Sequence, residues 1–289
     1  AARIEDNEEK KASADNMLRG YALRCESRLK KVEDLRQGLE RLTRENNAKS
    51  DRLGLLQAME REYEGFSHAV RRVMNAAQRG ALQGIHGPVS RLISVRDDAA
   101  VAVEIALGAA MQNIVTDDEQ AAKRAIAFLK SGDHGRATFL PLTAVRPRRG
   151  ERRSLDAEPG FLGYADDLTR CDDRYRVLVS SLLAGTAVVD HLDNAIALAK
   201  KTGYSVRIVT LDGQLIQTSG AMTGGSLNKN VGALSRKNEL ERLEKEIASA
   251  ADTLGQEERR LAEARRELEK AIAQNERRLE ALEAEMEQC

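Results

Sequence analysis

The chain has 289 residues, which is enough for one large or two small globular domains, and its 46 Lys and Arg residues balance 46 Asp and Glu residues. Charged residues make up 32% and aromatic residues 3%, a composition typical of long solvated helices and unusual for a compact enzyme. The zero net charge argues against a polybasic nucleic-acid binder.

The three cysteines, Cys25, Cys171 and Cys289, are far apart and show no CxxC spacing. Neither a disulfide framework nor a zinc site is expected, and a reducing cytosol fits. No apolar run approaches membrane-spanning length. The first residues are highly charged and both ends are periodic, so we expect a piece of a longer protein rather than a signal peptide.

Both ends of the chain carry heptad repeats, and we expect helical arms at residues 1–64 and 235–289. Asn46 and Asn275 interrupt the apolar seams, either to fix the register or as tolerated polar residues. The arms are expected to pair antiparallel within one chain, although pairing with another chain stays open. One stripe is Leu18, Cys25, Val32, Leu39, Asn46 and Leu53, and the other is Leu240, Ile247, Leu254, Leu261, Leu268, Asn275 and Leu282.

Between the arms, residues 65–234 contain an approximate repeat of strand, Ala-rich helix and strand. The copies cover residues 112–140 and 186–209, and Asp117 and Asp190 occupy the expected N-cap positions. The repeat predicts two subdomains, about 65–142 and 161–234. An Arg-rich linker, 143–160, joins them, and a solvated loop is favoured there over a phosphate-binding patch.

A glycine-rich segment ends the insert. Asp212-Gly213 predicts a hairpin turn between two short strands. Gly220, Gly224 and Gly225 then lie in a strand-like context, where glycine marks a bulge or the close approach of another backbone. The segment matches neither a phosphate-binding loop nor GxGxxG.

Three motifs of the insert, in this order, resemble those of the hinge of SMC (structural maintenance of chromosomes) proteins, in the style of the prokaryotic condensin type. They are ALGAAMQNIV at 106–115, GRATFLPL at 135–142 and GAMTGGS at 220–226. The resemblance covers the whole insert, and the arms fit the hinge-proximal coiled coil. One departure is Ser219-Gly220, where the family often has a glycine pair.

The resemblance implies an α+β fold, namely a two-subdomain mixed α/β hinge inserted between two helices of an antiparallel coiled coil. Two hinges would join through strand edges into a ring-like homodimer, with Gly220, Met222, Thr223, Gly224 and Gly225 at the interface.

The resemblance also implies DNA contact where the globule meets the coil. The matching basic residues are Arg71, Arg72, Lys229, Arg236 and Lys237. Their small number predicts weak, non-specific and salt-sensitive binding.

The resemblance also implies properties of the whole protein, which would act in chromosome condensation and segregation. It would be located in the cytoplasm, at the nucleoid, and would have no membrane partner. Its ATPase heads would bind ATP and Mg, and kleisin and accessory subunits would bind those heads. This chain carries no Walker motif. It is expected to hold no catalytic residue, cofactor or metal.

Three alternatives stay open. The chain could be a heterodimeric SMC of eukaryotic type, an α/β enzyme with coiled-coil arms, or a generic scaffold that dimerises through its arms. The enzyme hypothesis gains little from the four histidines, His68, His86, His134 and His191, because no pair has metal-ligand spacing.

Overall fold

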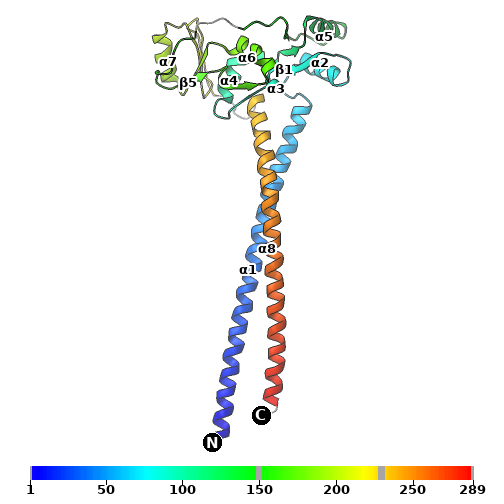
Figure 1. Cartoon of the computed structure of the whole chain (residues 1–289), viewed down its shortest axis with the longest axis vertical. Coiled ribbons are helices and arrows are strands. Elements are labelled where there is room, and N and C mark those ends of the chain that lie inside the picture. The colour runs from blue at the N-terminus through cyan, green and yellow to red at the C-terminus, as the bar shows by residue number, and fades with distance from the viewer. Residues whose placement is uncertain (1, 148–151, 227–231, 288–289) are drawn as a thin grey trace. The chain divides into compact units, whose positions relative to one another are not determined.

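The structure, a computed structural model, describes residues 2–147, 152–226 and 232–287 (Figure 1). Residues Gly54–Arg242 form one compact unit, and Ala1–Leu53 with Leu243–Cys289 form the other. The helices are α1 (Ala2–Arg61), α2 (His68–Gln78), α3 (Val89–Leu92), α4 (Ala100–Leu107), α5 (Glu119–Ser131), α6 (Arg176–Leu183), α7 (Leu192–Lys201) and α8 (Ala233–Glu287), with the 3-10 turns η1 (Gly108–Gln112) and η2 (Asp173–Tyr175). The strands are β1 (Ile85–Pro88), β2 (Ile93–Val95), β3 (Ile114–Thr116), β4 (Phe139–Pro141), β5 (Phe161–Tyr164), β6 (Thr169–Cys171), β7 (Thr186–Val189), β8 (Arg207–Thr210), β9 (Leu215–Ile216) and β10 (Met222–Thr223).

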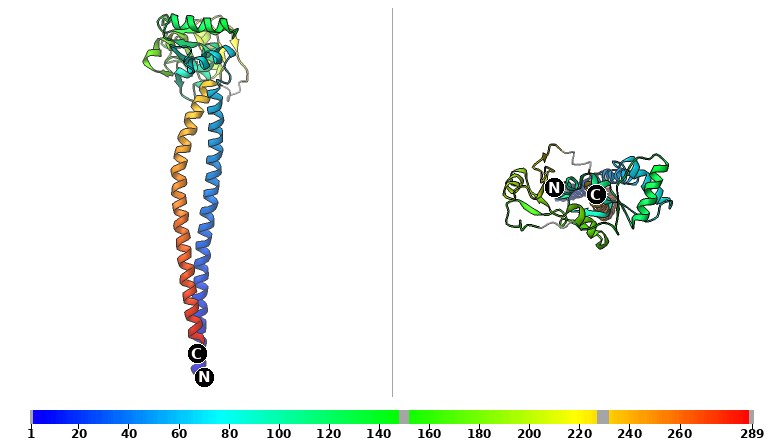
Figure 2. Two further views of the ribbon diagram at one scale, coloured as in Figure 1. Left: turned by 90° about the vertical axis from the view of Figure 1, so that its right-hand side faces the viewer. Right: turned by 90° about the horizontal axis from the view of Figure 1, so that it is seen from above.

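The heptad arms form an antiparallel coiled coil within the chain, as the sequence predicted. Helices α1 and α8 run side by side in Figure 1 and in the left-hand view of Figure 2. Lys31 pairs with Glu267 at 3.6 Å, and Lys49 pairs with Glu246 at 2.8 Å. Residue numbers thus rise along one helix as they fall along the other. Each helix thereby covers the apolar seam of its neighbour.

The two seam asparagines differ in their surroundings. Asn275 Nδ2 lies 2.9 Å from Cys25 Sγ and 3.4 Å from the Tyr21 carbonyl oxygen, both on the facing helix. Asn46 Oδ1 is buried and has no hydrogen-bond partner among the described residues. Asn275 therefore has contacts that suit a register-setting role, whereas Asn46 leaves a buried acceptor unsatisfied.

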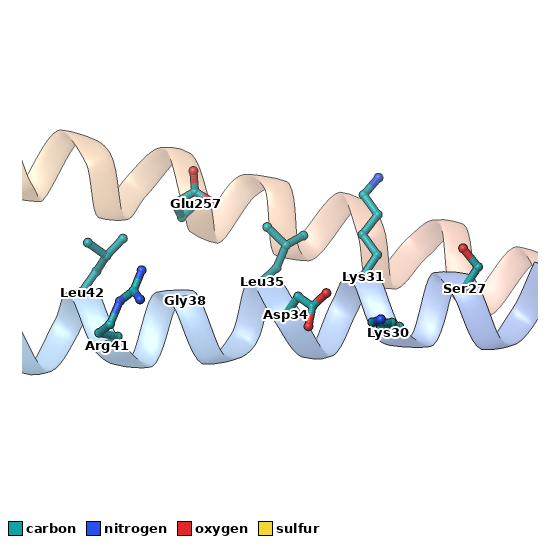
Figure 3. Close-up of a pocket in the computed structure, with 9 residues that line it drawn as sticks. All are labelled: Ser27, Lys30, Lys31, Asp34, Leu35, Gly38, Arg41, Leu42 and Glu257. Atoms are coloured by element: carbon teal, nitrogen blue, oxygen red, sulfur yellow. The ribbon is translucent and has the colours of Figure 1, made fainter.

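The coil is loosely packed around Gly38. Figure 3 shows Leu35 and Leu42 pointing from α1 toward α8, with Gly38 between them and Glu257 on the facing helix. A groove of about 540 Å³ lies here. A Cβ added at Gly38 or at Gly255 would meet no atom within 4 Å, so neither glycine is required by a close approach.

The globule contains the duplicated unit that the sequence predicted. In the first copy, β3 and β4 are parallel and joined through α5, and in the second copy β7 and β8 are parallel and joined through α7. Each copy adds an antiparallel strand, β1 or β5, whose register shifts at a bulge. The bulges contain Gly87 (φ 137°) and Gly163 (φ 139°), which adopt backbone angles that favour glycine. The sheet orders are β1-β3-β4 and β5-β7-β8-β9-β10.

The helix caps differ from the predicted ones. Asp118, not Asp117, is the N-cap of α5, and its Oδ1 accepts the Ala121 N–H at 2.7 Å. The N-cap position of α7 is His191, while Asp190 Oδ1 accepts the His191 N–H. The prediction for Asp117 was wrong because α5 begins at Glu119, so the residue in the cap position is Asp118, and the Asp117 side chain contacts His86 instead.

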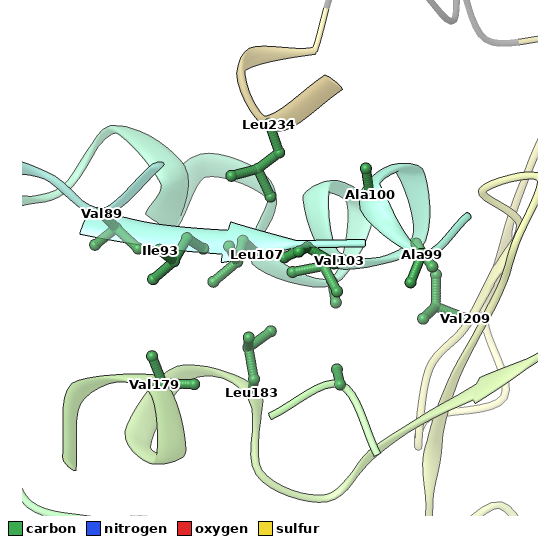
Figure 4. Close-up of a cluster of buried hydrophobic side chains, with 14 of the residues drawn as sticks. Val89, Ile93, Ala99, Ala100, Val103, Leu107, Val179, Leu183, Val209 and Leu234 are labelled. Carbon is green, nitrogen blue, oxygen red and sulfur yellow. The ribbon is translucent and has the colours of Figure 1, made fainter. Parts of the chain in front are cut away.

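Three apolar clusters hold the globule together. One lies between α2, α5 and the β1-β3-β4 sheet, and another lies between α7 and the β5-β7-β8-β9 part of the second sheet. The third and largest joins the copies, because side chains of α4, α6 and the first turn of α8 converge in it (Figure 4). Val103 of α4, Leu183 of α6 and Leu234 of α8 are almost completely buried there. The short β2–β6 pair adds backbone hydrogen bonds between the copies.

Asn46→Leu should raise the free energy of unfolding of the coil by about 1 kcal/mol, because it removes a buried unsatisfied acceptor and adds apolar contact. Thermal unfolding followed by far-UV circular dichroism measures the change. Asn47→Leu is the matched control, since Asn47 is exposed and its replacement should leave stability nearly unchanged. Equal effects of the two substitutions would contradict the assignment of Asn46 to the seam.

Candidate dimer interface

Strand β10 and the turn before it are exposed, as are all residues from 218 to 226, whereas β9 is buried. Within the described part of the chain, β10 pairs with β9 and lies at the edge of its sheet. The Gln217 N–H donates to the Ala221 carbonyl oxygen, so the alternation of an antiparallel ladder directs the Met222 N–H and C=O away from β9. Met222 is 53% exposed, although it is a large apolar residue. An unpaired strand edge and an exposed apolar side chain thus coincide.

The three glycines of this segment have reasons within the chain for being glycine. Gly220 (φ 82°) and Gly225 (φ 141°) adopt left-handed backbone conformations. A Cβ at Gly224 would lie 1.9 Å from Gln214 Oε1, which accepts the Gly225 N–H at 3.0 Å. Substitution at Gly220 or Gly225 would strain the backbone of the hairpin, and substitution at Gly224 would displace the Gln214 side chain from its hydrogen bond with Gly225. Met222 is the cleaner position at which to probe the edge.

A second unpaired edge belongs to β4. Among the described strands β4 pairs with β3 alone. The Thr138 carbonyl oxygen and the Leu142 N–H both bond to β3, so the Phe139 N–H and C=O point to the opposite side. Pro141 lacks an N–H, a residue that strands tolerate at an edge. The sequence analysis did not predict this edge, because nothing in a strand's own residues shows how many neighbours it has.

Comparison of the duplicated units shows what β4 lacks. Strand β8 is its counterpart in the second copy, and three of the four β8 residues are buried beside β9. All three residues of β4 are only half-buried, although they are Phe139, Leu140 and Pro141. The first copy therefore presents an apolar strand where the second copy has an additional neighbour.

The five predicted DNA-contact residues occupy different environments. Arg71 and Arg72 of α2 are exposed. Arg72 Nη2 lies 3.2 Å from His134 Nε2. Partial desolvation and then the Arg72 charge lower the pKa of His134 below its ordinary value, so the neutral imidazole can accept a hydrogen bond from the guanidinium. Lys229 lies outside the described residues.

Arg236 and Lys237 make contacts inside the globule at the start of α8. Arg236 is only 5% exposed, and its Nη2 donates to the Glu64 carbonyl oxygen at 3.2 Å. The Lys237 ammonium donates to the Ile93 carbonyl oxygen at 2.9 Å. Both side chains are thus occupied in joining helix ends to the globule, which leaves Arg71 and Arg72 as the more accessible positive charges of the predicted set.

Glu104 of α4 binds the first turn of α8. Its Oε1 accepts the N–H groups of Leu234 at 2.7 Å and Ser235 at 2.9 Å. These amides belong to the helix N-terminus, where N–H groups have no partner within the helix. Burial raises the pKa of Glu104 above its ordinary value, and the two N–H donors act in the opposite direction. The sequence offered no signal for this contact, because the two segments are far apart in the chain.

The described residues include no group of three or more His, Cys, Asp or Glu side chains placed to hold a metal ion. None of the described helices is long and apolar enough to cross a bilayer.

Comparisons with known proteins agree with this architecture. The family model for the SMC protein flexible hinge domain matches residues 82–199. The chain is 41% identical to the chromosome partition protein Smc of Bacillus subtilis over 198 residues, 67% of this chain and 16% of that protein. It is 36% identical to Smc of Gloeobacter violaceus over 262 residues, 86% of this chain and 21% of that protein. The chain thus spans about a fifth or less of these relatives.

Among solved structures, an asymmetric dimer of the SMC hinge domain of Geobacillus stearothermophilus matches with a TM-score of 0.74 and 38% identity. The match covers 84% of this chain and 98% of that one. A mixed α/β globule inserted between the helices of an antiparallel coiled coil defines the hinge class of coiled-coil proteins. The chain belongs to the SMC family, as a hinge domain with flanking coiled-coil helices related to bacterial Smc chromosome partition proteins.

Glu104→Gln should change the pH dependence of stability. Because the folded pKa of Glu104 is raised, the stability from this group is fully present below the ordinary carboxyl pKa and is lost as the pH rises through the raised value. The amide oxygen of the variant can still accept both N–H groups but cannot ionise. We expect the wild type to lose stability relative to the variant as the pH rises above the ordinary carboxyl pKa, measured by guanidinium unfolding over a series of pH values.

Glu119→Gln is the matched control with the opposite sign. A hydrogen bond from Thr143 lowers the pKa of Glu119, so its contribution is present above the ordinary pKa and is lost as the pH falls through the lowered value. Parallel pH curves for the wild type and the Glu104 variant would show that Glu104 does not titrate in this way.

Proposed function

We propose that this chain is the dimerisation module of a chromosome partition protein, and that it joins two copies through the exposed edges of β4 and β10. The observations that carry the proposal are two strand edges without a further partner among the described strands: β4, whose three apolar residues are only half-buried, and β10, which exposes Met222. The known dimer of the related Geobacillus stearothermophilus hinge supports it.

Pairing would use the outward backbone groups of both strands. Phe139 of β4 and Met222 of β10 each direct an N–H and a C=O to the open side. Addition of one strand edge to another supplies backbone hydrogen bonds and covers apolar side chains at the same time. Both strands are short, which limits the pairing to a few residues.

A homodimer follows from the presence of both edges on one chain. When β10 of one copy pairs with β4 of the other, a two-fold axis creates the same contact a second time. The two contacts would close a ring of two globules and leave neither edge exposed. In the heterodimer alternative, this chain would pair with a different protein that supplies the complementary strand edges. No described feature of this chain favours that alternative.

The scaffold alternative receives less support from the coil. The seams of α1 and α8 already face each other within one chain, as the Lys31–Glu267 and Lys49–Glu246 pairs show. An association through the arms would have to use their outer, mostly charged surfaces. Edge pairing in the globule uses groups that are otherwise unpaired.

DNA contact is a second part of the proposal and rests on Arg71 and Arg72. Both are exposed on the first two turns of α2, whose N-terminus is capped by Ser67. Phosphate groups are attracted by such a combination of guanidinium groups and helix N-terminus. Arg236 and Lys237 would add to the contact only if they became accessible to DNA, and Lys229 lies outside the described residues.

The activity of the whole protein lies beyond this chain and is likewise proposed. ATP hydrolysis with Mg, kleisin binding and the handling of chromosomal DNA at the nucleoid would belong to the remaining length of a protein like the Smc relatives. In that setting the hinge would hold two chains together while other domains carry out the chemistry. The proposed bounds of the hinge remain 65–234, with the subdomain and linker limits given above.

Met222→Lys should weaken the dimer by at least about tenfold, because an exposed charge on an edge strand opposes pairing with another edge. Sedimentation equilibrium of the full chain gives the dissociation constant. Leu162→Lys is the matched control, since Leu162 is 46% exposed on β5, the opposite edge of the same sheet. A Met222 variant as tightly dimeric as the control would exclude β10 from the interface.

Arg71→Ala with Arg72→Ala should reduce the salt dependence of DNA binding. Each lost phosphate contact lowers the slope of log affinity against log salt by about 0.9, so the expected loss is up to about 1.8. Fluorescence anisotropy with a short labelled duplex at several salt concentrations measures it. Arg265→Ala with Arg266→Ala on α8 removes two exposed charges from the coil and serves as the control. The same slope for both double variants would refute the assignment to α2.

A further inference from the structure

A polar relay connects three residues that are distant in the sequence. His86 Nε2 lies 2.7 Å from Asp117 Oδ1, and His86 Nδ1 lies 2.9 Å from the Tyr175 hydroxyl. The His86 and Tyr175 rings meet edge to face at 5.6 Å. Only 15% of the His86 side chain and 2% of Tyr175 are exposed.

The chemistry of the groups fixes the direction of one hydrogen bond and allows the other. A carboxylate can only accept, so His86 Nε2 donates to Asp117. In the tautomer with its proton on Nε2, His86 Nδ1 can accept a hydrogen bond from the Tyr175 hydroxyl. Burial raises the pKa of Tyr175, which keeps this hydroxyl protonated. Each member of the relay thereby has a defined role.

The relay crosses between the duplicated units. His86 belongs to β1, and Asp117 directly follows β3, so both are attached to the β1-β3-β4 sheet. The Asp117 N–H also donates to the Gly84 carbonyl oxygen at 2.9 Å, which holds the carboxylate beside β1. Tyr175 immediately precedes α6, which leads into β7, an interior strand of the other sheet. The relay therefore ties one sheet to the helix that feeds the other.

The second copy has no equivalent relay. Leu162 takes the place of His86, one residue before the bulge glycine in each case, and it is largely exposed. Asp190 takes the place of Asp117, and it accepts from Asn194 of its own helix at 2.9 Å. The contact between copies is thus a feature of the first copy and does not follow from the repeated fold.

We propose that the Asp117–His86–Tyr175 relay is a positioning clasp that fixes the orientation of the two sheets and, with it, the relative placement of the β4 and β10 edges. The central core holds the copies together through apolar contact, which has little directional preference. Hydrogen bonds are directional and weaken steeply when they are misaligned. The core therefore holds the two copies together, and the relay restricts the angle between their sheets.

The placement of the edges matters because a closed dimer needs two contacts at once. If the sheets of one chain rotated relative to each other, one β4–β10 contact could form only at the expense of the other. A fixed orientation raises the effective concentration for the second contact. The part of the inference that concerns dimerisation rests on the proposed function, whereas the part that concerns sheet orientation does not.

The experiment measures the distance between the sheets within one chain. In the full chain with its three cysteines replaced by alanine, spin labels are placed at Ile126 of α5 and at Tyr204 after α7, both of which are exposed. Labelled chain is diluted with unlabelled chain, so that double electron–electron resonance reports distances within a single copy. The distance distribution is compared for the wild type, His86→Ala, Tyr175→Phe and His86→Gln.

We expect a broader or displaced distribution for His86→Ala and Tyr175→Phe. His86→Gln should stay close to the wild type, because its amide can donate to Asp117 and accept from Tyr175. His191→Ala, an exposed histidine of the second copy, should have no effect. Unchanged distributions in both disruptive variants would overturn the proposal. Tyr175→Phe keeps the buried ring, so a general loss of packing is not expected to produce its effect.

Dimer dissociation constants of the same variants separate the two parts of the inference. Weakening of about tenfold in His86→Ala and Tyr175→Phe, with recovery in His86→Gln, would support the role in dimerisation. Altered distances with unchanged dimerisation would overturn that role and leave the clasp as an orientation device. A monomeric wild type would defeat the proposed function, while the distance distributions would still decide whether the relay orients the sheets.

Discussion

The proposed association of two chains depends on one constraint: strand β4 has a partner on one side only among the described strands. A strand in the interior of a sheet has its N–H and C=O groups paired on both sides and its side chains covered by neighbouring layers. Strand β8 meets these conditions because the β9–β10 hairpin follows it, and β4, its counterpart, does not. The first copy therefore has a short apolar strand with one unpaired side. The second copy ends in a hairpin whose last strand, β10, is exposed and pairs among the described strands with β9 alone. In the proposed dimer, β4 of one chain pairs with β10 of the other, so each strand supplies the partner that the other lacks. The additional hairpin of the second copy thereby makes the surface of the globule complementary to itself.

Charged residues at the helix ends have a structural role that composition does not show. Glu104 accepts the first N–H groups of α8, and Arg91 donates to the Glu60 carbonyl oxygen near the end of α1 while stacking 3.8 Å above the Tyr63 ring. Helix termini carry unsatisfied backbone groups and partial charges, so an acidic side chain suits the N-terminus of α8 and basic side chains suit the C-terminus of α1. Arg236 and Lys237 belong to the same network. A basic residue near the junction is therefore not by itself a sign of DNA contact.

The glycine segment shows how one residue type meets different requirements. Gly220 allows the turn between β9 and β10, Gly225 adopts an angle that other residues avoid, and Gly224 leaves room for the Gln214 side chain. These reasons concern the shape of the hairpin, which presents Met222 and the free edge of β10. The association proposed for the segment thus depends on the glycines indirectly, through the strand that they hold in position.

Periodicity in the sequence determined the coil, because the a and d positions of Leu39 and Leu261 can be buried only against another helix. Local patterns also determined the duplicated strand–helix–strand unit and the Asp212-Gly213 turn, since each depends on neighbouring residues. The tertiary structure alone decided the rest. It placed Asp117 on His86 instead of at a helix cap, and it brought Glu104 to the first turn of α8. Among the described strands, it also left β4 with β3 as its one neighbour. These features depend on contacts across 31 to 131 positions of the chain, or on the absence of a strand, and neither leaves a periodic signal in the residues involved.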